Sequence, residues 1–205
     1  MPETPQEFYA RAMAAADADG RLQFGQIPYW EIFPFELDGL KLKPLEPPVE
    51  TEPPRAGEGD EPCGGCEHRD DGLWLDDHWR VFALEPSGAP LALMLCPRDH
   101  YDFTDLPDDR AAELGRIMVK LGAAIEALPQ VARVHVLKWG DGGAHAHVFF
   151  LARPYGMLQL RGTMLAVWDD FLPPVPVDIR DADALTVVGE LARTYGGHVV
   201  VPDAV

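Results

Sequence analysis

A long amphipathic segment, flanked on both sides by expected strands, constrains the fold more than any other feature of the sequence. The segment runs from Pro107 to about Leu128. Its apolar residues recur at helical spacing and fall on one stripe: Leu114, Ile117, Met118, Leu121, Ile125 and Leu128. Asp108 and Asp109 lie in the first turn, where the helix dipole favours negative charge. We therefore expect a long helix with one apolar face.

Short apolar runs before and after this helix predict strands. The expected strands are Leu73–Leu75, Trp79–Leu84, Leu91–Cys96, Arg133–Trp139, His145–Ala152 and Val199–Val201. Turns at Glu85–Gly88 and Gly140–Gly143 separate the second strand from the third and the fourth from the fifth. Further helices are expected near the two ends of the chain, over about Pro5–Ala18 and Asp181–Tyr195. This pattern predicts an α+β fold built on an antiparallel meander.

Size and charge limit the partners of the chain. With 205 residues it can bury about 70% of its unfolded surface, so neither metal nor disulfide is needed to form a core. Its 34 acidic and 17 basic residues give a net charge of −17, which argues against nucleic acid and membrane surfaces as partners. No run approaches a membrane span of about 18 apolar residues, and the N-terminus carries acid and proline where a secretory signal is basic and apolar. We expect a cytoplasmic protein that acts on a small molecule.

The chain divides into three parts by composition. Residues 1–43 hold the N-terminal helix and an aromatic-rich arm, Phe24–Phe35, whose apolar surface must cover a core, a pocket or a partner subunit. Residues 44–62 contain six prolines, six acids and one arginine, which favours a solvated, semi-extended connector. Residues 63–205 form the expected working domain.

The cysteines suggest a metal site. Cys63 and Cys66 form a Cys-x-x-Cys motif, which in a reducing compartment indicates a metal knuckle or a redox pair before a structural disulfide. Such a knuckle supplies half of a tetrahedral zinc site. The redox alternative lacks a surrounding thioredoxin-like βαβ pattern. Cys96 alternates with apolar neighbours and is expected to be a buried core thiol.

Two histidines follow the glycine-rich loop. His145 and His147 are two residues apart on an expected strand, so both side chains should share one face, with Cα atoms about 6.6 Å apart. They could ligate one metal or be hydrogen-bonded inside a sheet. A cupin site is disfavoured because Phe149 and its apolar neighbours follow instead of a carboxylate. The loop could turn backbone N–H groups toward an anion, although a plain hairpin turn is the alternative.

In this order, the Cys-x-x-Cys knuckle, the Pro97–His100 turn before the long helix, the glycine-rich loop and the His-x-His strand resemble the histidine-triad superfamily. The resemblance covers Cys63 to about Arg153 and is to the zinc-containing branch that includes galactose-1-phosphate uridylyltransferases. It implies a HIT-like antiparallel sheet and a homodimer, with the Phe24–Phe35 segment as a candidate interface.

The resemblance also implies the site. The implied ligands of a structural Zn²⁺ are Cys63, Cys66, His100 and His145, which leave no open coordination position. His147 is then the implied nucleophile, which attacks an α-phosphate and forms a nucleotidyl-histidine. We expect its other ring nitrogen to be held by a backbone carbonyl in the 142–144 region.

Position 149 departs from the family pattern. The third triad residue is a histidine, or a glutamine in the uridylyltransferases, whereas Phe149 cannot donate a hydrogen bond to a leaving oxygen. A second register would make His145 the nucleophile and His147 the third histidine, leaving zinc with three protein ligands or with His68 as the fourth. We prefer the first register because it supplies a fourth ligand.

The remaining candidates would hold the substrate. They are Gly142 and Gly143 of the loop, and Lys138, Arg153, Gln159 and Arg161 as phosphate or leaving-group contacts, with solvated surface positions as the alternative for these last four. The expected activity is hydrolysis or transfer of a nucleotidyl group from a nucleotide or nucleotide conjugate. The alternative is a nucleotide-binding or assembly module whose catalysis is weakened by Phe149.

Overall fold

The computed structural model describes residues 4, 9–11, 13–21, 35, 44 and 46–201. The chain forms two compact units, Met1–Pro53 and Pro54–Val205, so the boundary falls inside the expected 44–62 connector. In the first unit, residues 9–11 and 13 are helical, within the expected N-terminal helix, and Gly20 has a positive φ of 73°. The aromatic arm lies, apart from Phe35, outside the described residues.

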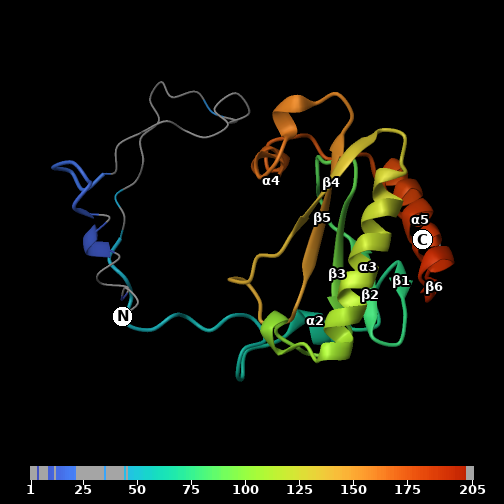
Figure 1. Ribbon diagram of the computed structural model, residues 1–205, viewed down its shortest axis with the longest axis horizontal. Coiled ribbons are helices and arrows are strands. Elements are labelled where there is room, and N and C mark those ends of the chain that lie inside the picture. The colour runs from blue at the N-terminus through green and yellow to red at the C-terminus, as the bar shows by residue number, and fades with distance from the viewer. Residues whose placement is uncertain are drawn as a thin grey trace. The chain divides into compact units, whose positions relative to one another are not determined.

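A six-stranded antiparallel sheet forms the centre of the second unit (Figure 1). Its strands are β1 (Trp74–Leu75), β2 (Trp79–Ala83), β3 (Ala92–Pro97), β4 (Val131–Leu137), β5 (Val148–Pro154) and β6 (His198–Val199). Their order is β4-β5-β3-β2-β1-β6, and each neighbouring pair is antiparallel. The meander predicted from the apolar runs is therefore present, and β6 closes it beside β1.

Two long helices cover one face of this sheet (Figure 1). The first, α3 (Asp108–Glu126), is the predicted amphipathic helix, and it buries Leu114, Ile117, Leu121 and Ile125. The second, α5 (Val177–Thr194), begins four residues earlier than predicted. Val177 and Ile179 are exposed, so the first turn of α5 lacks the apolar periodicity by which a helix is recognised.

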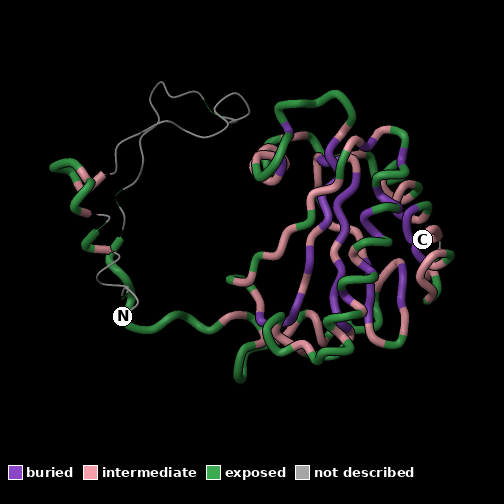
Figure 2. The backbone as a smooth tube through the Cα atoms, in the orientation of Figure 1, coloured by how far each residue is buried: buried purple, intermediate pink, exposed green. Residues whose placement is uncertain are grey.

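The main core lies between these helices and the sheet, where Figure 2 shows buried strand centres. Its fully buried side chains include Trp74, Val81, Leu93, Ile117, Phe150 and Val187. Among the described residues, the short helix α4 (Met164–Asp169) and the 3₁₀ turn Leu158–Leu160 cover one end of the opposite face of the sheet. A second apolar cluster, which includes Ala92, Leu151 and Leu165, fills that end. The other end of this face remains accessible to a ligand.

The strand that follows the glycine-rich loop begins three residues later than predicted. β5 starts at Val148, so His145 and His147 precede the strand and do not lie on it. Their backbone neighbours bond to loops instead: the Ala144 N–H donates to Ala56 O and the Ala146 N–H to Tyr101 O. The period-two argument for a shared face therefore does not apply to this histidine pair.

Candidate functional site

The side chains of two cysteines and two histidines lie close together near the end of β3 and the start of β5. Cys63 precedes the one-turn helix α2 (Gly64–Glu67), and the N–H groups of Cys66 and Glu67 donate to the Cys63 carbonyl, which brings Cys66 back beside Cys63. His100 follows β3 and His145 precedes β5. The ligand atoms of the four residues all lie within 4.8 Å of one another. Residues more than 80 positions apart in the chain are thus gathered around one point.

The spacing of the four ligand atoms fits a tetrahedral metal. Cys63 Sγ lies 3.3 Å from His100 Nδ1 and 3.4 Å from His145 Nδ1, and Cys66 Sγ lies 3.4 and 3.7 Å from the same two nitrogens. Zinc bonds of about 2.3 Å to sulfur and 2.0–2.1 Å to nitrogen at tetrahedral angles place S and N about 3.5 Å apart. A Cys₂His₂ set is also a donor combination that zinc prefers. The cluster can therefore hold a metal ion.

The surroundings prepare His145 to be a ligand. Its Nε2 lies 2.8 Å from Pro97 O, and because a carbonyl can only accept, Nε2 carries the proton and Nδ1 is left with a lone pair toward the cluster. Burial lowers the pKa of His145, which favours the neutral form that binds metal. Burial, together with a hydrogen bond to Cys63, raises the pKa of the Cys66 thiol to about 11, so metal binding would release a proton.

The geometry bears on the choice of register. His68 is exposed, and its Nδ1 pairs with Asp71 Oδ2 at 2.7 Å. The four-membered cluster contains His145 and does not contain His68. His145, the fourth ligand of the first register, therefore lies in the cluster, whereas His68, the additional ligand of the second register, lies outside it.

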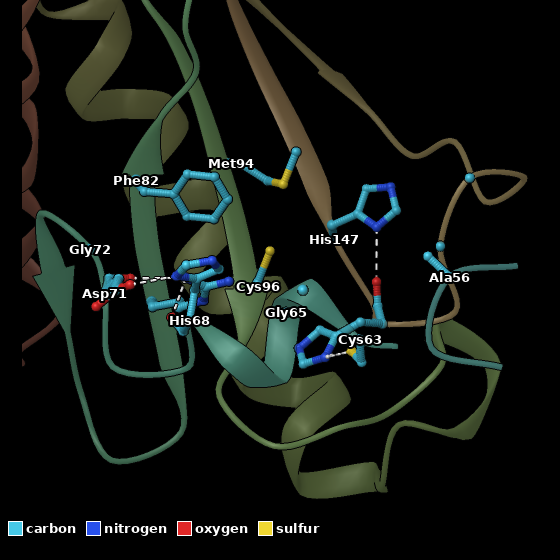
Figure 3. A pocket seen from close by; sticks show the side chains of 15 residues that line it. Ala56, Cys63, Gly65, His68, Asp71, Gly72, Phe82, Met94, Cys96 and His147 are labelled. Atoms are coloured by element: carbon cyan, nitrogen blue, oxygen red, sulfur yellow. Dashed lines mark hydrogen bonds and ion pairs between the residues drawn. The ribbon is translucent and has the colours of Figure 1, made fainter. Parts of the chain in front are cut away.

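His147 lies beside the cluster, and the backbone of one cluster residue accepts a hydrogen bond from its ring. Its Nδ1 is 2.8 Å from the His145 carbonyl oxygen, drawn as a dashed line in Figure 3. Since that carbonyl accepts, Nδ1 carries the proton and Nε2 is the unprotonated nitrogen of the neutral ring. The acceptor is thus His145 itself and not a carbonyl of residues 142–144, because the chain turns toward Tyr101 before β5 begins.

A pocket of about 550 Å³ opens in front of His147. Figure 3 shows Phe82 and Met94 on one side of it and His147 on the other. Cys96, which is 3% exposed, contributes to the same wall, so the expected core thiol also faces the pocket. The pocket therefore combines apolar walls with one histidine and a glycine-rich loop.

Arg80 was not among the sequence candidates, yet it lines the pocket and is only 5% exposed. Its Nη1 donates to the carbonyls of His68 and Asp71 at 2.5 and 3.0 Å, and its buried Nε has no hydrogen-bond partner among the described residues. Its guanidinium also lies 4.8 Å from the centre of the Phe82 ring. The available signal was an arginine between two apolar residues of an expected strand, a position where an unpaired charge is costly.

The expected substrate contacts separate into two groups. Gly142 and Gly143 line the pocket, whereas Lys138, Arg153, Gln159 and Arg161 are not among its lining residues. Arg153 is buried and donates to the carbonyls of Pro154 and Met157. β5 runs away from His147, so six residues along an extended strand carry Arg153 about 20 Å from it.

The other three residues have different surroundings. Lys138 Nζ lies 5.5 Å from the centre of the Phe103 ring. Gln159 is exposed on the 3₁₀ turn Leu158–Leu160, and Arg161 Nε donates to the Leu158 carbonyl at 2.8 Å. These positions place Gln159 and Arg161 with the second apolar cluster at the far end of the sheet.

The segment of residues 54–58, called the strap below, fixes the glycine-rich loop. The Ala56 N–H donates to Gly142 O at 3.3 Å, and Ala56 O accepts from the Ala144 N–H at 2.9 Å. Arg55 Nη1 donates to Gly140 O at 3.1 Å, and Nη2 pairs with Asp102 Oδ2 at 2.6 Å. The hydrogen bond from Arg55 holds the pKa of the Asp102 carboxyl below its usual range. Part of the expected connector is therefore structure at the site.

The fold and the site together define an α+β protein with a Cys₂His₂ cluster beside a histidine-lined pocket. No family model matches the chain. No curated protein matches it either. Among solved structures, a hypothetical histidine triad nucleotide-binding protein from Sulfolobus tokodaii has 13% identity and a TM-score of 0.50, over 65% of this chain and 97% of that one.

Two further similar structures carry the same family description. A histidine triad protein from Marinobacter aquaeolei has 18% identity and a TM-score of 0.48, over 62% of this chain and 92% of that one. A Zn-bound histidine triad family protein from Mycobacterium smegmatis has 15% identity and a TM-score of 0.44, over 59% and 83%. The likeness to the Sulfolobus protein shows that the chain has the histidine-triad fold, so the predicted HIT-like α+β class is confirmed.

None of the described helices is both long and apolar enough to cross a bilayer.

Proposed function

We propose that this protein is a zinc-stabilised, HIT-like nucleotide hydrolase or nucleotidyltransferase in which His147 is the nucleophile. The observation that carries the proposal is the hydrogen bond from His147 Nδ1 to the carbonyl of His145, whose own ring enters the metal cluster. One residue thereby connects the cluster to the proposed nucleophile. The resemblance to the zinc-containing uridylyltransferase branch supports the same assignment of Cys63, Cys66, His100 and His145 as ligands.

The proposed metal is structural. When bound, zinc would fix the knuckle, the turn after β3 and the segment before β5, and its four protein ligands would leave no position for a substrate. The chemistry therefore belongs to His147 and the pocket residues.

His147 is arranged for attack on phosphorus. Its Nε2 lone pair would form the bond to the α-phosphorus. The His145 carbonyl would keep its hydrogen bond from Nδ1–H and so stabilise the positive charge that develops on the ring. Gly142 and Gly143 would bring backbone N–H groups close to the phosphate oxygens. Phe82 and Met94 would hold the nucleoside, in a pocket within the usual ligand-site range of about 300–1,000 Å³.

The alternative function is a nucleotide-binding or assembly module with the same fold. Phe149 favours it, because its ring lies against His147 where a third triad residue would supply a proton to the leaving group. We further propose a homodimer and a cytoplasmic location, as the resemblance implies, and sedimentation of the purified chain tests the dimer.

Incubation of the zinc-loaded protein with labelled dinucleoside polyphosphates, nucleotide sugars and nucleoside phosphoramidates tests the function. We expect an acid-labile nucleotidyl adduct that is lost in His147→Ala while zinc stays bound. His198→Ala, which changes an exposed histidine on β6, is the matched control and should keep the adduct. An adduct that survives His147→Ala and vanishes in His145→Ala would assign the other register. Nucleotide binding without any adduct would favour the module.

A further inference from the structure

Two aromatic rings continue from the proposed nucleophile along the open face of the sheet. The Phe149 ring lies 5.2 Å from the His147 ring at an interplanar angle of 89°, and 5.2 Å from the Trp139 ring at 54°. Both separations are typical of attractive aromatic contacts. Trp139 is 48% exposed, so a large apolar surface is presented to solvent close to the site. We call Trp139 and Phe149 the aromatic shelf.

The shelf belongs to the face that holds the pocket. Phe149 is paired with Met94 across β5 and β3, and residues directly opposite one another on antiparallel strands point to the same face. Met94 lines the pocket, as does His147. The shelf therefore extends the apolar wall beyond His147.

The shelf cannot supply a proton for a leaving group. Phe149 has no polar atom, and the indole of Trp139 donates hydrogen bonds but does not transfer its proton near neutral pH. Lys138, which follows β4, has its Nζ over the Phe103 ring, and Arg153, farther along β5, donates to two carbonyls. A leaving oxygen at this position would depart as an anion.

We propose that the aromatic shelf is the leaving-group subsite, and that it takes a planar aromatic group joined to the α-phosphate through an acidic oxygen. The inference rests on the proposed function and names the substrate class of that site. The Nε2 lone pair of neutral His147 forms the N–P bond, and the P–O bond breaks with its electron pair passing to the oxygen, which leaves as an aryloxide-type anion. Water then cleaves the N–P bond, gives its proton to solvent and releases neutral His147.

Stacking on the exposed indole of Trp139 would provide the attraction that binds the aromatic leaving group. A ring–ring contact contributes enough to change affinity by roughly threefold to tenfold. The exposed surface of Trp139 would then contact the aromatic leaving group.

The experiment uses the full zinc-loaded chain and nucleoside 5′-monophosphate aryl esters whose phenols differ in acidity, with an alkyl ester and a phosphoramidate for comparison. We expect the rate of adduct formation to rise steeply with the acidity of the phenol, and the alkyl ester and phosphoramidate to react slowest. Phe149→His, which restores a donor, should accelerate the alkyl ester and phosphoramidate more than the most acidic aryl ester. Equal rates across the series in the native chain would overturn the proposal.

Variants of the indole test stacking directly. Trp139→Ala should raise KM for the aryl esters by roughly tenfold and leave KM for the matching nucleoside triphosphate unchanged, whereas Trp139→Phe should keep most of the affinity. Tyr155→Ala, at an exposed tyrosine beyond β5, is the control and should change neither. An equal loss with both substrates would show that Trp139 supports the fold only.

Failure of the proposed function can be told apart from failure of the shelf. If no adduct forms with any substrate, calorimetric titration with a non-reactive aryl phosphonate of a nucleoside still tests the shelf. Trp139→Ala should weaken binding of the aryl phosphonate and not of the nucleoside monophosphate. Unchanged binding of the phosphonate would contradict the subsite.

Discussion

His145 connects three parts of the site through three different atoms. Its Nδ1 enters the metal cluster, its Nε2 is held by Pro97 O, and its carbonyl holds His147. A displacement of this ring would therefore disturb both metal binding and the orientation of the proposed nucleophile. The knuckle is shaped around the ring, because a Cβ added at Gly65 would lie 2.5 Å from His145 Cγ.

The two adjacent glycines of the knuckle give a matched test. Gly65→Ala should weaken zinc binding and destabilise the fold by about 1–3 kcal/mol, because the new methyl group meets a packed ring. Gly64→Ala should be tolerated, since nothing lies within 4 Å of a Cβ at that position of the same helix. Competition with a chromogenic chelator and urea unfolding measure the two effects. Equal zinc affinity and equal free energy of unfolding in the two variants would contradict the close approach of Gly65 to the His145 ring.

His135 on β4 gives a pH-dependent prediction away from the cluster. Burial, with a smaller effect of Arg153, lowers the pKa of His135, while the charge of Glu126 opposes the shift. Within the described part of the chain, its buried Nε2 has no hydrogen-bond partner. Below the unfolded pKa of about 6.5 the unfolded chain takes up a proton that the folded chain resists, so stability falls as the pH decreases.

Replacement of this histidine should remove that dependence. We compare the free energy of unfolding of the native chain with that of His135→Leu. The value for the native chain minus the value for the variant should decrease as the pH falls from about 7 to about 5.5. Urea titrations at constant zinc across this range measure the difference. Parallel curves for the two proteins would show that His135 is not shifted in the folded state.

At the scale of elements, the strap and the loop it holds form one unit of the site. Gly140 O and Gly142 O accept hydrogen bonds from Arg55 and Ala56, so the carbonyls of the loop are turned toward the strap. In a trans peptide the following N–H points the opposite way, which leaves it free to face an anion. The strap is thus expected to set the anion-binding conformation of the loop.

Arg55→Ala should therefore weaken binding of a nucleoside monophosphate by roughly tenfold, with zinc content unchanged, because the charge-assisted hydrogen bonds from the strap to Gly140 O and Asp102 Oδ2 are lost. Arg55→Lys should restore part of the affinity through the pair with Asp102. Arg193→Ala removes an exposed ion pair with Glu190 on α5 and serves as the control. Calorimetric titration measures the affinities, and unaltered binding in Arg55→Ala would contradict a role for the strap in the loop.

Elements with a regular apolar period were predictable, and those held by loop contacts were not. α3 and the strands β2 to β4 follow from local sequence, because the buried residues of α3 form one stripe and the strands are short, mostly apolar runs bounded by turns. The start of α5 carries exposed apolar residues, and the start of β5 is set by hydrogen bonds to Ala56 and Tyr101. Such partners are distant in sequence, so no local pattern reveals them.

The same limit applied to the site. Residue types and order pointed to Cys63, Cys66, His100 and His145, which the fold gathers into one cluster. Arg80, Phe82 and the strap lacked a motif, because they reach the pocket only through the pairing of strands and loops. Arg153 was a candidate because it is close to His147 in sequence, but β5 runs away from His147 and places Arg153 far from it.

For the whole molecule, a net charge of −17 opposes the approach of an anionic substrate. Raising the ionic strength from about 0.01 M to about 0.15 M shortens the Debye length from about 30 Å to about 8 Å and screens that repulsion. KM for a nucleotide should therefore fall with added salt, while the affinity for the uncharged nucleoside stays constant. Steady-state kinetics over this range measure the effect. A KM that rises with salt would instead indicate a locally cationic site.

In the proposed mechanism His147 carries the nucleotidyl group, while His145 is a ligand in the metal cluster. Rapid quenching of the native zinc-loaded chain with a nucleotide substrate, followed by proteolysis and mass spectrometry under neutral conditions, locates the modified residue directly. We expect a nucleotidyl group on His147 and an unmodified His145. A nucleotidyl group on His145, or no modified histidine while product forms, would contradict it.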